Sequence, residues 1–264
     1  LGFFTAGVEY YRDEVSSDGK NVPAAGAATF FERGSVADDA QYALFGVFLQ
    51  DEITFWKKLD VTAGLRYSRA EVDADHVDPI PSDAVVFNDV EDTYDAVVGN
   101  LRLLYHLGEH WNLIAGWGMG FRAPSLDDST GIQMTLSGTL DLPADDLDPE
   151  RTHTFDVGIR SRYEFEKWGF ESGLFLYHTL IRDFIGRVSA GIDYDGNGTT
   201  DNTKDNVSDG FVHGVEFQGR VTWRKDWSLF GDAAWTFGES DVLIGTRETE
   251  RPIAKLNPAM GHLG

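Results

Sequence analysis

The sequence predicts an all-β fold, a transmembrane antiparallel β-barrel, and three observations support this. Short charged turns that carry a Trp recur along the chain, at 56–58, 108–111, 166–168 and 224–227. Longer, polar and mostly acidic connections alternate with them, at about 13–39, 72–92, 122–149, 187–208 and 240–256. Each side of a short turn holds about ten residues of alternating character, which is enough to cross a bilayer as a tilted strand.

The alternation of apolar and polar residues predicts where the strands lie. It is clearest in five segments, 59–68, 94–105, 111–122, 152–164 and 212–224. In the first of them, Leu65 faces one way and Arg66 the other. Weaker alternation predicts four more strands near 3–12, 41–54, 169–185 and 227–238, and a tenth that begins near Pro258.

The two faces of these strands differ as the two faces of a barrel wall do. The polar face carries charges of both signs, which suits a wide, water-filled lumen. The side chains that we expect to face this lumen are Arg66, Arg102, Arg160, Arg162, Glu216 and Arg220. The apolar face ends at the short turns in aromatic residues that include Trp56, Trp111, Trp168 and Trp227. Such a row is typical of the aromatic girdle at a headgroup interface.

A soluble sheet with one wet face would show the same alternation. The repeat period also fits a β-propeller blade of about 40–50 residues. A blade packs four short strands, however, whereas each period here offers two long strands and a loop of about 20 residues or more. The pattern therefore favours the barrel over a propeller or a sandwich.

Composition and motifs argue against two functional classes, nucleic-acid-binding proteins and enzymes. The chain has 264 residues and a net charge of −22, which argues against a nucleic-acid partner. It has no Cys and no G-x-S-x-G or H-E-x-x-H motif, so an outer-membrane enzyme is disfavoured. The segments 71–95 and 123–150 are rich in carboxylates and contain no Lys or Arg. They are expected to be solvated loops, which divalent cations can bridge outside a membrane.

Five short motifs follow one another along the chain. They are Ala63-Gly64-Leu65-Arg66-Tyr67, then Gly120-Phe121-Arg122-Ala123-Pro124-Ser125, Leu147-Asp148-Pro149-Glu150 with Phe155-Asp156-Val157-Gly158-Ile159-Arg160, Gly214-Val215-Glu216, and Pro252-Ile253 with Asn257-Pro258. In this order they resemble the barrel of TonB-dependent outer-membrane receptors. Asp156 stands where that family usually has Glu. The resemblance covers nearly the whole chain.

The resemblance implies a barrel of the 22-stranded type with a plug in its lumen. It implies the outer membrane of a Gram-negative bacterium, with its lipid and lipopolysaccharide, as the location. It also implies uptake of a scarce, large nutrient (a ferric siderophore, vitamin, haem or oligosaccharide), driven by the TonB complex. No plug, signal peptide or final strand is recognised, so residues 1–264 are expected to be part of a longer barrel. A diffusive porin or an adhesin barrel is the alternative.

The second motif and Glu150 are the candidate ligand-loop residues, namely Phe121, Arg122, Ala123, Pro124, Ser125 and Glu150. They lie where a predicted strand passes into a long loop and where the next strand begins. Shaping this transition is the simplest role for them. Contact with the nutrient is the alternative, because binding residues gather on loops.

One loop resembles a calcium-binding loop. Oxygen-bearing residues occupy alternate positions, with Gly198 at the sixth, and they are Asp193, Asp195, Asn197, Thr199 and Asp201. The twelfth position, which needs a bidentate Glu, is Lys204. The sequence therefore leaves two readings open, a weak Ca²⁺ site or an acidic turn rich in Asn and Gly. No other cofactor is expected, because the histidines show no metal-ligand spacing.

Overall fold

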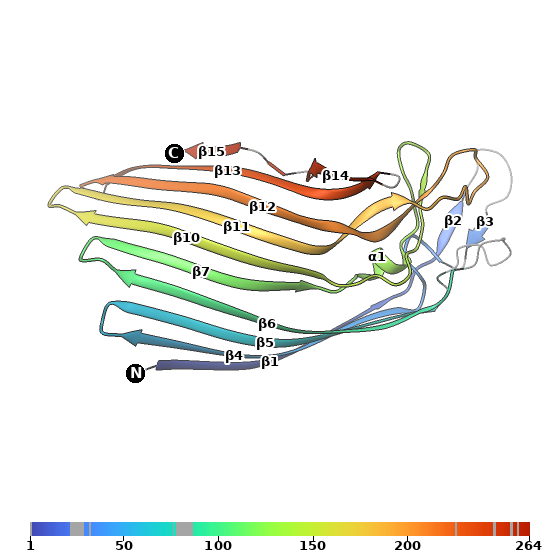
Figure 1. Cartoon of the computed structure of the whole chain (residues 1–264), viewed down its shortest axis with the longest axis horizontal. Helices are drawn as coiled ribbons and strands as arrows, with labels where there is room; N and C mark the ends of the chain where they lie inside the picture. Colours follow the sequence, from blue (N-terminus) through green and yellow to red (C-terminus); the bar gives the residue numbers. More distant parts are fainter. Residues whose placement is uncertain are drawn as a thin grey trace.

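The computed structural model shows a long, curved, open sheet of 13 strands (Figure 1). It describes residues 2–21, 29–31, 33–75, 77, 87–224, 226–244, 247–253, 256–257 and 259–264. The long strands are antiparallel and lie side by side in the order in which they occur along the chain: β1 (Gly2–Val15), β4 (Ala40–Phe55), β5 (Leu59–Ala74), β6 (Val90–His106), β7 (Trp111–Arg122), β10 (Glu150–Glu164), β11 (Trp168–Ser189), β12 (Asn202–Trp223) and β13 (Trp227–Ile244). The prediction of an antiparallel all-β fold is confirmed.

The two edges of this sheet do not meet within the described residues. β1 pairs with β4 alone. At the other edge, β14 (Arg247–Pro252) pairs with Glu239–Ile244 of β13, and β15 (Ala259–Leu263) pairs with Gly231–Trp235. Both short strands thus share one neighbour. β15 confirms the predicted tenth strand, although Pro258 itself lies outside the described residues.

Tight turns join the strands at one end of the sheet, on the left in Figure 1. In the first of them, the Lys58 N–H donates to the Phe55 carbonyl at 3.0 Å. Trp56 and Lys57, at the centre of the turn, have φ angles of 49° and 58°. Positive φ at both central residues is what a type I′ turn requires, and the twist of such a turn matches that of the strands it joins. All four predicted short turns join strands at this end, although Lys225 of the fourth lies outside the described residues.

The strand register separates two faces along the whole sheet. On one face, Leu65 lies opposite Leu49 and Gly99, and Phe217 lies opposite Leu174 and Ala233. The Leu65 side chain is 62% exposed and Phe217 is 49% exposed. So many exposed apolar side chains would be untenable in water, but they suit a wall that hydrocarbon covers. The continuous sheet also excludes the propeller alternative.

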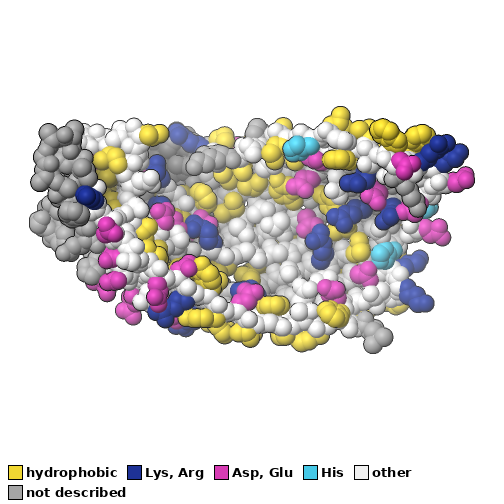
Figure 2. Space-filling view, turned by 180° about the vertical axis from the view of Figure 1, so that it is seen from behind, with side chains coloured by type: hydrophobic (Ala, Val, Ile, Leu, Met, Phe, Trp, Pro, Cys, Tyr) yellow, Lys and Arg dark blue, Asp and Glu magenta, His cyan; other side chains and the backbone are white. Residues whose placement is uncertain are grey.

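The opposite face is hollowed and polar. Figure 2 looks into it, and Lys, Arg, Asp and Glu side chains gather along the hollow. Glycines leave room for some of the largest of these side chains. A Cβ on Gly116 would lie 2.2 Å from Asp156 Oδ1 on the neighbouring strand, so a larger residue there would force the Asp156 side chain to move.

Two predicted loops are wrong in their extent, because the strands continue into them. β11 and β12 stay paired up to Ser189 and Asn202, so the connection expected at 187–208 spans only 190–201. β13 likewise runs to Ile244 and pairs with β14 inside the expected 240–256 loop. Beyond the bilayer, both faces of a strand are in contact with water. Strand pairing therefore continues there without the alternation of apolar and polar residues from which strands are predicted.

The remaining long connections pack against one another at the end opposite the tight turns (Figure 1). They contain the hairpin β2 (Gly19–Asn21) and β3 (Thr29–Phe31), the helix α1 (Leu126–Thr130), β8 (Gln133–Met134) and β9 (Leu140–Asp141). A small apolar core joins them to the strands, with Ala37, Val72, Val77, Val90 and Leu126 among its members. Parts of the predicted loops at 13–39, 72–92 and 240–256 lie outside the described residues. No described helix is long and apolar enough to cross a membrane.

Arg33 is the buried cation of this loop end. The residue is only 4% exposed, and its guanidinium donates hydrogen bonds to the carbonyls of Val77 and Thr130. Val77 and Thr130 belong to two different long connections, and Arg33 belongs to a third. One side chain therefore links all three connections. The described parts of the acidic connections therefore form a compact cap.

Candidate functional site

The Gly120–Ser125 motif turns the chain from the sheet into the cap. β7 ends at Arg122, and Ala123 and Pro124 are buried immediately after it. Ser125 then caps α1: its Oγ accepts from the Asp128 N–H at 3.3 Å, and the Ser125 N–H donates to Asp128 Oδ2 at 3.0 Å. This reciprocal pair is a capping box with Asp in place of the usual Glu. It fixes the direction in which the chain leaves the strand.

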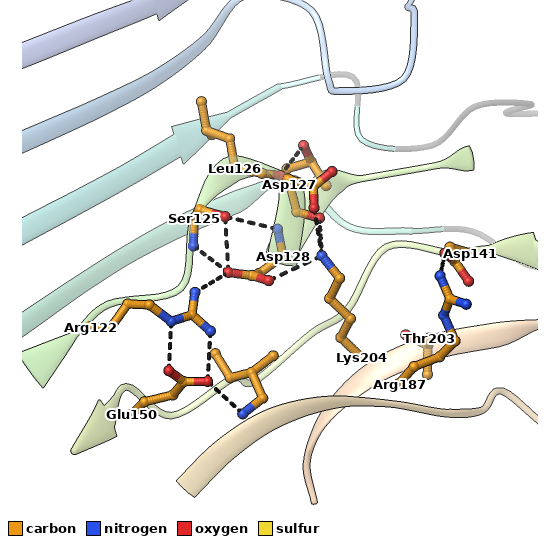
Figure 3. A network of polar contacts seen from close by, with 12 residues as sticks. Arg122, Ser125, Leu126, Asp127, Asp128, Asp141, Glu150, Arg187, Thr203 and Lys204 are labelled. Carbon is orange, nitrogen blue, oxygen red and sulfur yellow. Dashed lines mark hydrogen bonds and ion pairs between the residues drawn. The ribbon is translucent and has the colours of Figure 1, made fainter. Parts of the chain in front are cut away.

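Arg122 joins this helix to the next strand (Figure 3). Its Nε and Nη2 donate to the two carboxylate oxygens of Glu150 at 2.7 and 2.8 Å, and its Nη1 donates to Asp128 Oδ2 at 2.7 Å. Glu150 is the first residue of β10 and the register partner of Arg122. Glu150 Oε1 also accepts from the Ile185 N–H of β11 at 2.9 Å. One fork-shaped contact therefore connects β7, α1, β10 and β11.

Lys204 completes the network from β12. Its Nζ donates to Asp127 Oδ2 at 2.7 Å and to Asp128 Oδ1 at 3.0 Å (Figure 3). Burial alone would raise the pKa of Asp128, but hydrogen bonds from the Ser125 N–H, Arg122 and Lys204 outweigh it and lower the pKa to about 2. We call Arg122, Ser125, Asp127, Asp128, Glu150 and Lys204 the loop anchor.

The structure divides the predicted ligand-loop residues into three groups. Arg122, Ser125 and Glu150 belong to the loop anchor, and Ala123 and Pro124 are buried beside it. Phe121 lies on the other face of β7, opposite Arg151 of β10. The hydrogen bonds of Arg122, Ser125 and Glu150 hold the passage from strand to loop together, which supports the structural role for these three. A role in ligand contact stays a prediction.

Sequence reasoning missed three members of the loop anchor, namely Asp127, Asp128 and Lys204. The spacing of Ser125 and Asp128 is that of a capping box, so the sequence did contain a signal for Asp128. Lys204 occupies the twelfth position of the calcium-loop pattern. It lies in β12 and points at α1, far along the chain, and no local pattern signals such a contact.

The predicted lumen residues lie along the hollowed face. Arg66 pairs with Glu9 at 2.8 Å and Arg162 with Glu171 at 3.6 Å. The guanidinium of Arg160 lies 5.0 Å from the ring centroid of Phe175, and that of Arg220 lies 5.4 Å from the ring centroid of Phe230. Glu216 and Arg102 line the same recess as Arg160.

Three of these arginines, namely Arg102, Arg160 and Arg220, form no ion pair within the described residues. A recess of about 560 Å³ lies over β10 to β13, and its lining includes Arg160, Glu171, Arg220 and Asp232. The face can therefore offer positive charge to a group that enters the hollow.

The 193–201 loop brings three of its predicted ligands together. Single carboxylate oxygens of Asp193, Asp195 and Asp201 lie within 4.8 Å of one another. Gly198 has a φ angle of 88°, as the tight turn requires. The carboxylates also accept backbone N–H groups, as in the bonds from Asn197 and Gly198 to Asp193 at 3.0 and 2.7 Å. These bonds shape the turn without an ion, so Ca²⁺ binding stays a prediction.

Asp201 has a structural role of its own. It is fully buried, and its two oxygens accept from the N–H groups of Leu140 and Tyr194 at 2.7 and 2.8 Å. Leu140 belongs to the preceding long connection. Asp201 thus attaches the 193–201 loop to the 123–149 connection. The other two predicted ligands, Asn197 and Thr199, are exposed, and the Thr199 N–H donates to Asn197 Oδ1 at 2.8 Å.

We expect Glu150→Gln to destabilise the whole barrel by about 1.5–3 kcal/mol, because it removes the charge from a buried, hydrogen-bonded carboxylate. The matched control is Glu164→Gln on the same strand. Both glutamates pair with an arginine, but the Glu150 side chain is 14% exposed and the Glu164 side chain is 69% exposed. The control should leave stability unchanged within error. Urea titration of the full-length protein in lipid measures both, and equal losses would contradict the loop anchor.

The comparisons with known proteins agree with this architecture. A model of the family described as TonB dependent receptor-like, beta-barrel, matches residues 1–264. Among curated proteins, none matches the sequence. Among solved structures, the copper transporter OprC is similar, with 19% identity and a TM-score of 0.71 over 99% of this chain and 38% of its own.

Two further solved receptors are similar in the same way. The Serratia marcescens hemophore receptor HasR, solved with its hemophore HasA and heme, has 15% identity and a TM-score of 0.68 over 98% of this chain and 44% of its own. The siderophore receptor PirA from Pseudomonas aeruginosa has 17% identity and a TM-score of 0.64 over 94% of this chain and 44% of its own. The chain thus spans less than half the length of these receptors. At such identities the likeness shows the fold.

The family model, unlike these distant structures, matches the sequence itself from its first residue to its last. The strand order, the tight turns at one end and the apolar wall all agree with it. The chain therefore belongs to the TonB-dependent receptor-like β-barrel family, whose members are non-enzymatic transporters in the outer membrane of Gram-negative bacteria.

Proposed function

We propose that this chain forms part of the barrel wall of an outer-membrane receptor that takes up a scarce, large nutrient. The family match over residues 1–264 carries this proposal. The nutrient is a ferric siderophore, a vitamin, haem or an oligosaccharide. Solved receptors similar to this chain are named for copper, haem with its hemophore, and siderophores, which supports a metal-bearing cargo without selecting one.

The charged side chains on the hollowed face fit this proposed function. A plug in the barrel, or a passing nutrient, needs polar and charged partners on the wall. Arg102 and Arg160 have no ion-pair partner in the described part of the chain, so they are suited to bind carboxylates of the plug or of the cargo. The TonB complex is the proposed source of energy, acting through a region of the full-length protein outside this chain.

The test compares uptake with and without energy from TonB. A strain that lacks the gene is complemented with the full-length receptor, and uptake of labelled ferric siderophores, haem, cobalamin and oligosaccharides is measured. We expect one class of nutrient to depend on both the receptor and TonB. Uptake that persists in a TonB-deficient strain would instead identify a diffusive porin.

The tight turns are proposed to be periplasmic and the long connections extracellular. The basis is the difference in length between the two ends of the sheet. We expect a protease site between Ser137 and Gly138 to be cleaved on intact cells and one between Glu166 and Lys167 to be protected. The opposite pattern would reverse the orientation. Cleavage at both sites after the cells are lysed serves as the control.

A further inference from the structure

We infer that the outer wall of this chain binds the phosphate of an outer-leaflet lipid, through Arg151 of β10 and Arg182 of β11. This inference rests on the orientation proposed above. The two residues are direct partners in the strand register. Side chains opposite each other in this way begin about 5 Å apart, close enough to hold one anion between them.

The arginine pair is unusual because no carboxylate of the described residues forms an ion pair with it. Like charges directly opposite each other destabilise a sheet. Both side chains are exposed. Asp209 is the carboxylate of β12 nearest to the pair in the strand register, because it precedes Gly210, the register partner of Ile181. It forms no ion pair with either arginine. The pair therefore presents positive charge outward, away from the hollow.

The surroundings of the pair are those of a membrane interface. Phe121 lies beside Arg151 on the same face. His153, one step below Arg151, stacks on Trp117 with ring centroids 6.2 Å apart, and His178, a further step below, stacks on His213 at 6.1 Å. Amphipathic rings of this kind prefer the headgroup level, between hydrocarbon and water. This belt is on the long-loop side and is separate from the Trp residues of the tight turns.

The height of the pair fits the headgroup phosphates. Tyr163 lies at the tight-turn end of β10 and Arg151 at its other end. They are about twelve residues apart, which at about 3.4 Å per residue and a tilt of about 40° is about 30 Å along the membrane normal. The apolar band of such a wall is about 25 Å tall. Arg151 and Arg182 therefore lie just beyond the hydrocarbon of the outer leaflet.

A lipid-borne phosphate fits better than a free anion. Below the arginines the same face is apolar and exposed, with Phe155, Val157, Leu176 and Leu180 between 40% and 51% exposed. Acyl chains can lie on this surface while the phosphate accepts from the two guanidinium groups. The occupant that combines a phosphate with several acyl chains in the outer leaflet is lipid A.

The experiment uses the purified, delipidated full-length receptor in detergent, with EDTA present so that cations cannot bridge lipid to the acidic loops. Binding of bisphosphorylated lipid A is titrated by native mass spectrometry. We expect the R151Q/R182Q double variant to bind about tenfold more weakly or worse, because each basic residue near a lipid phosphate contributes to affinity. R151K/R182K, which keeps both charges, should retain most of the binding.

The matched control is K57Q/K58Q, which removes two positive charges at the tight-turn end and should bind lipid A as the unaltered receptor does. Dephosphorylated lipid A should bind the unaltered receptor no more tightly than it binds the R151Q/R182Q variant. Equal binding of lipid A by the receptor and R151Q/R182Q would overturn the inference. Displacement of lipid A by millimolar inorganic phosphate would show a free-anion site and would overturn it too. Nutrient uptake and the protease-site test are independent readouts, so failure here is distinguishable from failure of the proposed function.

Discussion

Leu101→Arg should destabilise the complete barrel by about 2–4 kcal/mol, whereas Asn100→Arg, one residue away, should cost far less. Leu101 lies on the apolar face, between Ala63 and Trp117 in the register. It is four residues from Tyr105 at the tight-turn rim, about 10 Å towards the middle of the membrane at about 3.4 Å per residue and a tilt of about 40°. An arginine there must either remain in hydrocarbon or distort the bilayer.

Asn100 is the matched control because it points into the hollow. Its register partners are Gly64 and Gly118, which leave space for a longer side chain. A second comparison tests depth: Leu103→Arg lies on the same face as Leu101 but closer to the rim, so its cost should fall between the other two. Folding titrations into lipid vesicles with urea measure all three. Equal costs for Leu101→Arg and Asn100→Arg would show that the two faces have been assigned wrongly.

The sequence predicts strands well wherever one face of the sheet is covered by hydrocarbon. β7 was predicted at 111–122 and occupies the same residues, because Trp111, Leu113, Trp117 and Phe121 alternate with small or polar residues between two clear boundaries. The upper halves of β11 and β12 lack this contrast. At Asp183, with a φ of 55°, a bulge also shifts the register, so alternation on the two sides of it is out of phase.

The candidate site was predictable to the extent that it follows strand neighbours. Arg122 ends one predicted strand and Glu150 precedes the next, so their pairing follows from an antiparallel register across the 122–149 connection. The contact of Lys204 with α1 depends on β12 extending beyond the membrane and on the connection folding back over it. No pattern within either segment encodes that approach. Local sequence therefore predicts the wall, whereas the cap depends on contacts between distant segments.

Residues 1–264 expressed alone should not fold into a stable, closed barrel. The described residues leave β1 with one neighbour, and at the opposite edge β14 and β15 pair with β13 alone. Each unpaired backbone N–H or C=O in hydrocarbon costs several kcal/mol, and β1 alone is 14 residues long. No local adjustment of side chains can offset a cost that recurs along two strand edges.

The same edges determine how the isolated chain should fail. In water or detergent, exposed edge strands pair with other copies, and the apolar wall adds to their association. We expect refolding of residues 1–264 to give heterogeneous, protease-sensitive oligomers, while the full-length receptor refolded in parallel gives a heat-modifiable monomer. Light scattering after size exclusion, together with gel mobility before and after boiling, separates these outcomes. A monodisperse, heat-modifiable and protease-resistant monomer of the 264-residue chain would mean that β1 and the β13 edge do meet, and that this sheet closes without further strands.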